Sequence, residues 1–145
     1  MIPKIIQPFL WSSDDCIFCK INKNEIPSYT LYEDELIRVF LDAFPKVEGH
    51  LLIIAKDHCE NIFDASDEVL ARINLVAKKM ALILKDKLGA TGVNVINNSG
   101  ADAQQEVPHL HYHLIPRFKN DALNLKFNGA KKEGIVVAEV FGKLS

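Results

Sequence analysis

Residues 107–118 read VPHLHYHLIPRF, and histidine alternates with an apolar or aromatic side chain over 109–114. Successive side chains of a β-strand point to opposite faces, so the alternation predicts a strand over 109–118 with one apolar face. His109, His111 and His113 are expected to share the other face, spaced about 6.5–7 Å apart along the strand. Three imidazoles placed in this way are close enough to build one polar site.

The composition indicates an ordinary globular domain. The chain has 145 residues, and 17 Lys and Arg against 19 Asp and Glu give a formal net charge of −2. This balance lacks the basic excess that favours nucleic-acid binding. No apolar run approaches the roughly 18 residues of a membrane span, and the first residues are too interrupted by prolines for a signal peptide. We therefore expect a cytoplasmic protein with no nucleic-acid partner and no membrane partner.

Hydrophobic periodicity predicts one long helix and five strands. The helix is expected over 67–88, with Ser66 as its N-cap and Gly89 at its end. The strands are expected at 29–34, 36–44, 50–56, 92–99 and 109–118. Short early connections and one long helix favour an α+β fold, a mostly antiparallel five-stranded meander sheet with the helix packed on it.

The chain shows no internal repeat and no linker that would divide it into several domains. We expect one main domain over 14–118. An irregular extension over 1–13 precedes it, and a tail over 119–145 follows and packs on the domain or on a partner subunit. The last apolar run of the tail, 135–141, is expected to form either a strand or a short helix.

The histidine run is compatible with two kinds of chemistry. In the first, all three imidazoles bind one catalytic metal ion, as in three-histidine zinc sites. In the second, His111 is a nucleophile or general base, and its two neighbours orient it and hold a substrate phosphate. The polar loop NNSGADAQQ at 97–105 favours the second chemistry, because backbone N–H groups in turns can cradle a phosphate.

The motif CIFC at 16–19 suggests a metal or redox site, since the chain carries no secretory signal that would favour a disulfide. A structural zinc site needs four nitrogen or sulfur ligands. Candidates for the remaining two are His50, His58, Cys59 and the histidines of the run. Adjacent residues rarely bind one ion together, and we expect Cys59 to be a packed thiol.

Several motifs together resemble the histidine-triad (HIT) superfamily, in its Hint-like bacterial branch. They are CIFCKI and EIPS near the N-terminus, FLDAFPKVEGHLLIIAKDH at 40–58, NVINNSG, and QEVPHLHYHLIPR, which contains HLHYHLI at 109–115. The resemblance covers about residues 14–118. It implies a homodimer whose two sheets join into one continuous sheet. It also implies an enzyme that binds purine nucleotides of the AMP or GMP type and cleaves at the α-phosphorus through a transient nucleotidyl-histidine.

The resemblance also implies residue roles. His111 matches the nucleophile, His113 and His109 match its flanking histidines, and His50 matches a second histidine of the same network. Asp42 matches the acid that binds the ribose hydroxyls. The other positions that match nucleotide-binding residues, besides His111 and His113, are Phe40, Asn98, Gly100, Gln105 and Glu106. Glu106 departs from the pattern, because better-studied branches carry there a serine that helps to protonate the leaving group.

The zinc-carrying members of the superfamily imply one structural zinc ion per chain and no organic cofactor. The matching ligands are Cys16, Cys19, His58 and His109, which leaves Cys59 out. The leading hypothesis is therefore a nucleoside phosphoramidate or nucleotidyl hydrolase acting through His111. The alternatives are a dinucleoside polyphosphate hydrolase with the same site, a nucleotide-binding sensor or partner module with little turnover, and the three-histidine metal site.

Overall fold

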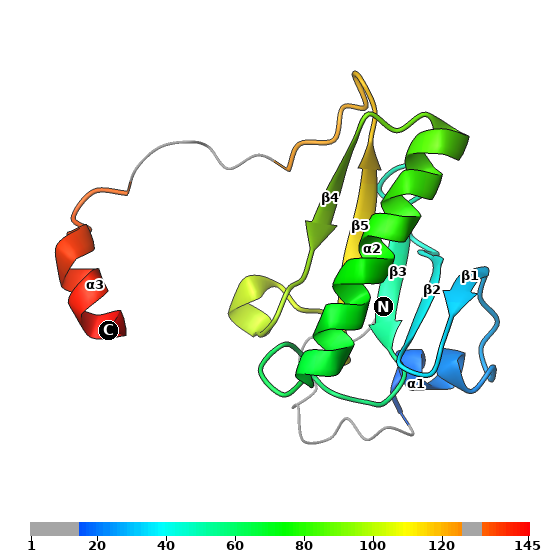
Figure 1. Ribbon diagram of the computed structural model, residues 1–145, viewed down its shortest axis with the longest axis horizontal. Coiled ribbons are helices and arrows are strands. Elements are labelled where there is room, and N and C mark those ends of the chain that lie inside the picture. The colour runs from blue at the N-terminus through cyan, green and yellow to red at the C-terminus, as the bar shows by residue number, and fades with distance from the viewer. Residues whose placement is uncertain (1–14, 126–131) are drawn as a thin grey trace.

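The computed structural model describes residues 15–125 and 132–145, so the predicted extension at 1–13 lies outside the described residues. The elements follow one another along the chain as α1 (Ile17–Asn22), β1 (Thr30–Glu33), β2 (Ile37–Leu41), β3 (Leu51–Ala55), α2 (Asp67–Leu88), β4 (Gly92–Ile96), the 3₁₀ turn η2 (Ala101–Ala103), β5 (His111–Arg117) and α3 (Val137–Leu144). Figure 1 shows α2 lying lengthwise across one face of the sheet.

The five strands form one sheet in the order β1-β2-β3-β5-β4, and every pairing is antiparallel. The first three strands are a meander. The chain then crosses the sheet as α2, forms the edge strand β4, and returns as β5 between β3 and β4 (Figure 1). The predicted α+β fold, an antiparallel five-stranded sheet with one long helix, is confirmed. The return of β5 carries its histidines into the middle of the sheet.

β3 is buried along its whole length because both faces of the sheet are covered. Leu51 and Ile53 belong to the larger apolar cluster, which includes the inward side of α2. Leu52 and Ile54 belong to a second cluster with residues of α1. This explains why the strand reads as a continuous apolar run rather than as an alternation.

The ends of α2 follow from local sequence, as predicted. The Ser66 hydroxyl accepts a hydrogen bond from the Val69 amide at 3.2 Å, which satisfies one unpaired donor of the first turn. Gly89 ends the helix in the left-handed conformation with φ +74°. Over the residues that the structure describes, no helix is both long enough and apolar enough to span a bilayer.

Gly49 lies against the last turn of α2 and precedes β3. Its φ is +88°, and a Cβ atom there would lie 2.7 Å from Leu88 Cδ1 and 3.1 Å from Leu84 Cδ2. Glycine is therefore required both by the backbone conformation and by the close packing. The turn delivers the next residue, His50, to the start of β3.

The predicted strand at 109–118 was wrong at its start. β5 begins at His111, and His109 lies in a bend before it, where its amide donates to the Val107 carbonyl at 2.8 Å. The predicted strand at 92–99 likewise ends early, at Ile96. In the tail, 137–144 form a helix, so of the two alternatives for the last apolar run the helix is correct. The packing of the tail on the domain or on a partner subunit stays a prediction.

Candidate functional site

His111 is held as a neutral imidazole with one free nitrogen. Its Nδ1 lies 2.8 Å from the His109 carbonyl oxygen, and because a carbonyl only accepts, Nδ1 carries the hydrogen. Burial lowers the pKa of His111 to about 4, although the hydrogen bond to His109 opposes this shift. Nε2 is therefore left with an unshared lone pair, which is the state that a nucleophile requires.

Two residues that the sequence did not single out hold the segment around His111. The Phe18 ring of α1 meets the His111 ring edge-on, with the ring centres 5.1 Å apart. The Asn97 side chain donates to the His111 carbonyl at 3.0 Å. Phe18 lies between the two cysteines of CIFC, so its position in that motif was the available signal, whereas nothing in the sequence distinguishes Asn97 from its neighbour.

A second chain of hydrogen bonds orients His113. The Lys46 amide donates to His50 Nδ1 at 3.1 Å, so the hydrogen of a neutral His50 lies on Nε2. His50 Nε2 is 2.9 Å from His113 Nδ1 and 3.4 Å from a carboxylate oxygen of Asp42. With its Nδ1 accepting, His113 carries its own hydrogen on Nε2. Burial lowers the pKa of both histidines, which keeps them neutral near pH 7.

The predicted nucleotide residues on the β2 side have different degrees of exposure. Asp42 is partly exposed just after β2, and its carboxylate also accepts from the Phe44 amide at 2.9 Å. Phe40 is only 4 % exposed and packs edge-on against Phe18 with the ring centres 6.0 Å apart. Phe40 therefore supports the ring of Phe18 and offers almost no surface of its own.

The loop before β5 is fixed by the Gln105 side chain. The Gln105 carbonyl oxygen accepts from the Gly100 amide at 2.8 Å and from the Asn61 side chain at 3.2 Å. The Gln105 NH₂ group donates to the carbonyls of Glu60 at 2.7 Å and Val107 at 3.0 Å. Both hydrogens and both lone pairs of this amide are thus used within the protein. The side chain of Gln105 thus has a structural role, and its predicted contact with a phosphate stays a prediction.

Of the other predicted residues of this loop, Asn98 and Glu106 remain open to a ligand, whereas the Gly100 amide already donates to Gln105. The Asn98 side chain is partly exposed, and no other described residue forms a hydrogen bond with it. Gly100 adopts φ +96°, which favours glycine and turns the backbone between β4 and η2. Glu106 is exposed, and its negative charge acts on both His111 and His113.

The candidate zinc ligands Cys16, Cys19, His58 and His109 converge, with all four ligand atoms within 4.8 Å of one another. His109 Nδ1 lies 3.2 Å from Cys16 Sγ, 3.5 Å from Cys19 Sγ and 3.1 Å from His58 Nδ1. Ligand atoms around a tetrahedral zinc ion are separated by roughly 3.3–3.8 Å, given bond lengths of about 2.0–2.3 Å. The His109 Nε2 hydrogen goes to the Ala55 carbonyl at 2.8 Å, so the Nδ1 lone pair faces the sulfurs. This donor set fits zinc.

The same geometry bears on two further predictions, that Cys59 is not a zinc ligand and that the three histidines of the run could share one metal ion. Cys59 stays outside the cluster and packs against the apolar cluster under α2, and burial raises the pKa of its thiol to about 11. Among the described residues, His111 belongs to no group of converging metal ligands, and His109 and His113 belong to two different groups. The hypothesis of one metal ion held by all three histidines is therefore wrong.

The family model of the HIT domain matches residues 23–120. The chain belongs to the HIT family. It is 46% identical over 102 residues to the adenosine 5'-monophosphoramidase HNT1 of Saccharomyces cerevisiae, an alignment that covers 70% of this chain and 62% of the yeast protein. This relationship supports a nucleotide hydrolase at the level of the family.

Two solved HIT structures have the same fold. A HIT family protein from Bacillus anthracis superposes with a TM-score of 0.79 at 34% identity and covers 92% of this chain and 94% of its own. A zinc-bound histidine triad family protein from Mycobacterium smegmatis superposes with a TM-score of 0.75 at 33% identity, covering 82% and 86%. The second shows that a HIT fold of this kind can hold zinc.

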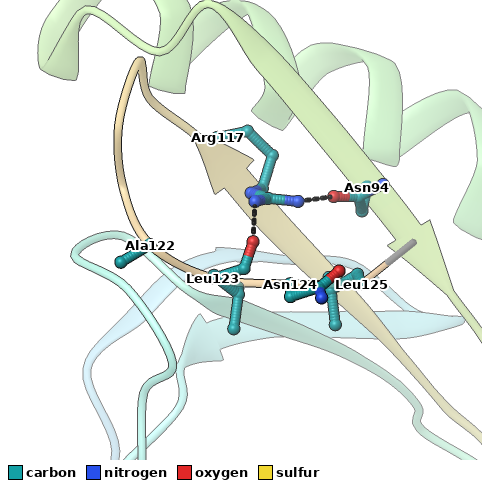
Figure 2. A pocket seen from close by; sticks show the side chains of 6 residues that line it. All are labelled: Asn94, Arg117, Ala122, Leu123, Asn124 and Leu125. Carbon is teal, nitrogen blue, oxygen red and sulfur yellow. Dashed lines mark hydrogen bonds between the residues drawn. The ribbon is translucent and has the colours of Figure 1, made fainter.

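A hollow that contains none of the predicted site residues lies at Arg117, between β4 and the segment after β5 (Figure 2). The Arg117 guanidinium forms an ion pair with Asp121 at 2.8 Å, donates to Asn94 on β4 at 2.9 Å, and also donates to the Leu123 carbonyl. Figure 2 shows this guanidinium between Asn94 and Leu123. Because Asp121 balances its charge, Arg117 fixes the segment after β5 to the sheet edge and is not an anion site.

Proposed function

We propose that this protein hydrolyses nucleoside phosphoramidates by double displacement through His111. The observation that carries the proposal is the fixed tautomer of His111, a buried neutral imidazole whose Nδ1–H is bound to the His109 carbonyl and whose Nε2 is free. The similarity to a yeast adenosine 5'-monophosphoramidase supports the substrate class.

In the first step, His111 Nε2 forms a bond to the α-phosphorus while the bond from phosphorus to the leaving nitrogen breaks. The electron pair stays on that nitrogen, which takes up a proton from solvent and departs as an amine. In the second step, water attacks the phosphorus and gives up a proton to solvent while the bond to Nε2 breaks; its electron pair returns to Nε2, which releases the nucleoside monophosphate and restores neutral His111. Throughout both steps, the Nδ1–H group of His111 remains hydrogen-bonded to the His109 carbonyl, and this carbonyl stabilises the positive charge that develops on the ring.

The neighbouring residues have supporting roles in this proposal. His113 donates its Nε2 hydrogen to the reacting phosphate group, and His50 keeps that hydrogen in place from the other side of the ring. Asp42 accepts hydrogen bonds from the ribose hydroxyls, which suits a partly exposed carboxylate. Asn98 offers its amide to a phosphate oxygen. The nucleoside is therefore expected beyond the end of β2, with its phosphate at the imidazoles.

A zinc ion at Cys16, Cys19, His58 and His109 is proposed as structural. Four protein ligands leave no open position for a water molecule or a substrate, so the ion would contribute folding stability rather than chemistry. The ion would also hold the side chain of His109, whose carbonyl fixes the tautomer of His111.

The test is turnover of adenosine 5'-phosphoramidate by the full chain and by H111N. H111N is expected to lose at least a thousandfold in kcat while AMP still binds, because the nucleophile is gone and the ribose and phosphate contacts remain. The matched control is Y112F, on the opposite face of the same strand, which should keep its activity. Rapid quenching should also trap a nucleotidyl group on His111. An H111N enzyme with full activity, or saturable binding without turnover in the wild type, would contradict the proposal.

We further propose that two copies associate through β4 and α2. β4 is an edge strand, and Val93 and Val95 share the α2 face of the sheet, where they are 38 % and 47 % exposed. On α2, Leu75 and Leu82 are 69 % and 49 % exposed. Burying these side chains and pairing the strand edge would join two sheets into one. The variant V95K should be a monomer by light scattering, and a wild type that is itself monomeric would refute this association.

A further inference from the structure

Glu106 is a charged residue at the imidazoles to which the proposed mechanism gives no role. Its side chain is exposed, and among the described residues it has neither a hydrogen-bond partner nor an ion-pair partner. The carboxylate of Asp42 differs, since it already accepts from the Phe44 amide and lies 3.4 Å from His50 Nε2. Glu106 therefore keeps its whole accepting capacity for a ligand.

The backbone on both sides of Glu106 is held in place. The preceding residue, Gln105, is fixed by the four hydrogen bonds of its side chain. The following residue, Val107, packs against the apolar cluster that contains Phe18, and Phe18 in turn meets the ring of His111. The backbone that carries Glu106 is thus held in place beside the site, and only the side chain is free to meet a ligand.

The charge of Glu106 reaches the reacting groups. Burial lowers the pKa of His111 and of His113. The negative charges of Glu106 and Asp42 raise both pKa values and so oppose this effect. The positive charge of Lys46 lowers the pKa of His113 further. Two carboxylates and one ammonium group therefore act on the imidazoles. A leaving group that carries several negative charges meets repulsion here, whereas a positively charged one is attracted.

The two carboxylates come from different segments of the chain. Asp42 follows β2, and Glu106 belongs to the loop that leads into β5. Because the proposed function assigns Asp42 to the ribose, Glu106 is the carboxylate that is left for the group that departs from the phosphorus. We propose that Glu106 selects the leaving group, so that the substrate is a nucleoside phosphoramidate whose departing amine carries a second, positively charged group. This inference rests on the proposed function, since it concerns the same cleavage of a phosphorus–nitrogen bond.

The test uses three adenosine 5'-phosphoramidates that differ only in the far end of the leaving amine. The amines are 1,4-diaminobutane, butylamine and 4-aminobutyrate, which end in a cationic, a neutral and an anionic group. For the wild type, kcat/KM should be highest for the cationic and lowest for the anionic leaving group. An interaction between unit charges about 6 Å apart at a protein surface changes kcat/KM by roughly tenfold. The ratio of kcat/KM for the cationic substrate to kcat/KM for the anionic substrate should therefore fall about tenfold or more in E106Q.

The matched control is D102N, which removes another exposed carboxylate from the same loop and should change the ratio less than twofold. A ratio that is the same in E106Q and in the wild type overturns the inference and leaves the proposed function intact. The same holds if E106Q slows all three substrates equally, because Glu106 would then act on every leaving group alike.

Absence of turnover with all three compounds would instead refute the proposed function. In that case the Kd values of the same compounds, measured by calorimetry for the wild type and E106Q, still test the charge preference. A cationic preference that E106Q abolishes supports the inference, and equal Kd values overturn it.

Discussion

The variant Q105A tests whether the loop before β5 is built by the Gln105 amide. Truncation removes four hydrogen bonds, which leaves the Gly100 amide, the Asn61 side chain and the carbonyls of Glu60 and Val107 without this partner. A hydrogen bond contributes about 1 kcal/mol net, and water reaches part of this half-buried network. We therefore expect the ordered loop to lose about 2–3 kcal/mol, well below the roughly 5–15 kcal/mol that holds a whole domain together.

The assay combines kinetics with local hydrogen exchange. A loss of 2–3 kcal/mol corresponds to roughly a 30- to 150-fold fall in kcat/KM for adenosine 5'-phosphoramidate, carried mainly by KM because phosphate contacts are lost. The amides of 97–105 should exchange faster by a similar factor. The control is Q104A, because Gln104 is exposed and no described residue forms a hydrogen bond with its side chain.

Two results would refute this reasoning. If Q105A keeps kcat/KM within twofold of the wild type, the amide does not organise the loop. If Q105A loses activity while the exchange of 97–105 is unchanged, Gln105 acts on the phosphate directly, as the sequence suggested, and the structural role is wrong.

Three further predictions concern the metal, acid stability and the turn before β3. C19S should lose zinc by elemental analysis and unfold at lower temperature, whereas C59S should keep its zinc; equal zinc in both variants would contradict the ligand set. Burial raises the pKa of the Asp34 carboxyl, but hydrogen bonds from Arg72, two backbone amides and Tyr32 outweigh this and lower it to about 2. The ionised Asp34 carboxylate should therefore contribute about 2 kcal/mol to the free energy of unfolding above pH 4, and this contribution should be lost as the pH falls through 2. In D34N the free energy of unfolding should depend less on pH over this range. G49A should cost about 2–4 kcal/mol in urea unfolding through left-handed strain and the clash with Leu88, and an unchanged midpoint would refute the packing argument.

The features that local sequence determines were predictable. The helix α2 could be placed to the residue because Ser66 and Gly89 act on their own neighbours. The sheet could be predicted because alternation of the kind seen in β5 is typical of a strand, and because the unbroken apolar run in β3 reflects a strand whose two faces are both covered. The four candidate zinc ligands also converge as the family resemblance implied.

The features that depend on distant partners were not predictable. His109 continues the alternation of the histidine run, but it leaves the strand and its ring turns to Cys16 and Cys19, 93 and 90 positions earlier in the chain, which the family resemblance implied and the alternation did not. The side-chain partners of Gln105 include Glu60 and Asn61 from the segment before α2, which no local pattern indicates. The edge-on contact of Phe40 with Phe18 of α1 likewise joins distant segments, and the predicted nucleotide contacts of Gln105 and Phe40 stay predictions.

The saturation of the Gln105 amide has a thermodynamic consequence. A loop that is held by the four hydrogen bonds of one side chain has less conformational entropy to lose when a ligand arrives. Association of AMP should then resemble docking to a rigid receptor, with a fast on-rate, a small change in heat capacity and no slow conformational phase. The selectivity of the protein would accordingly reside in the charges and shape of the preformed site, rather than in a closing motion that distinguishes correct from incorrect substrates.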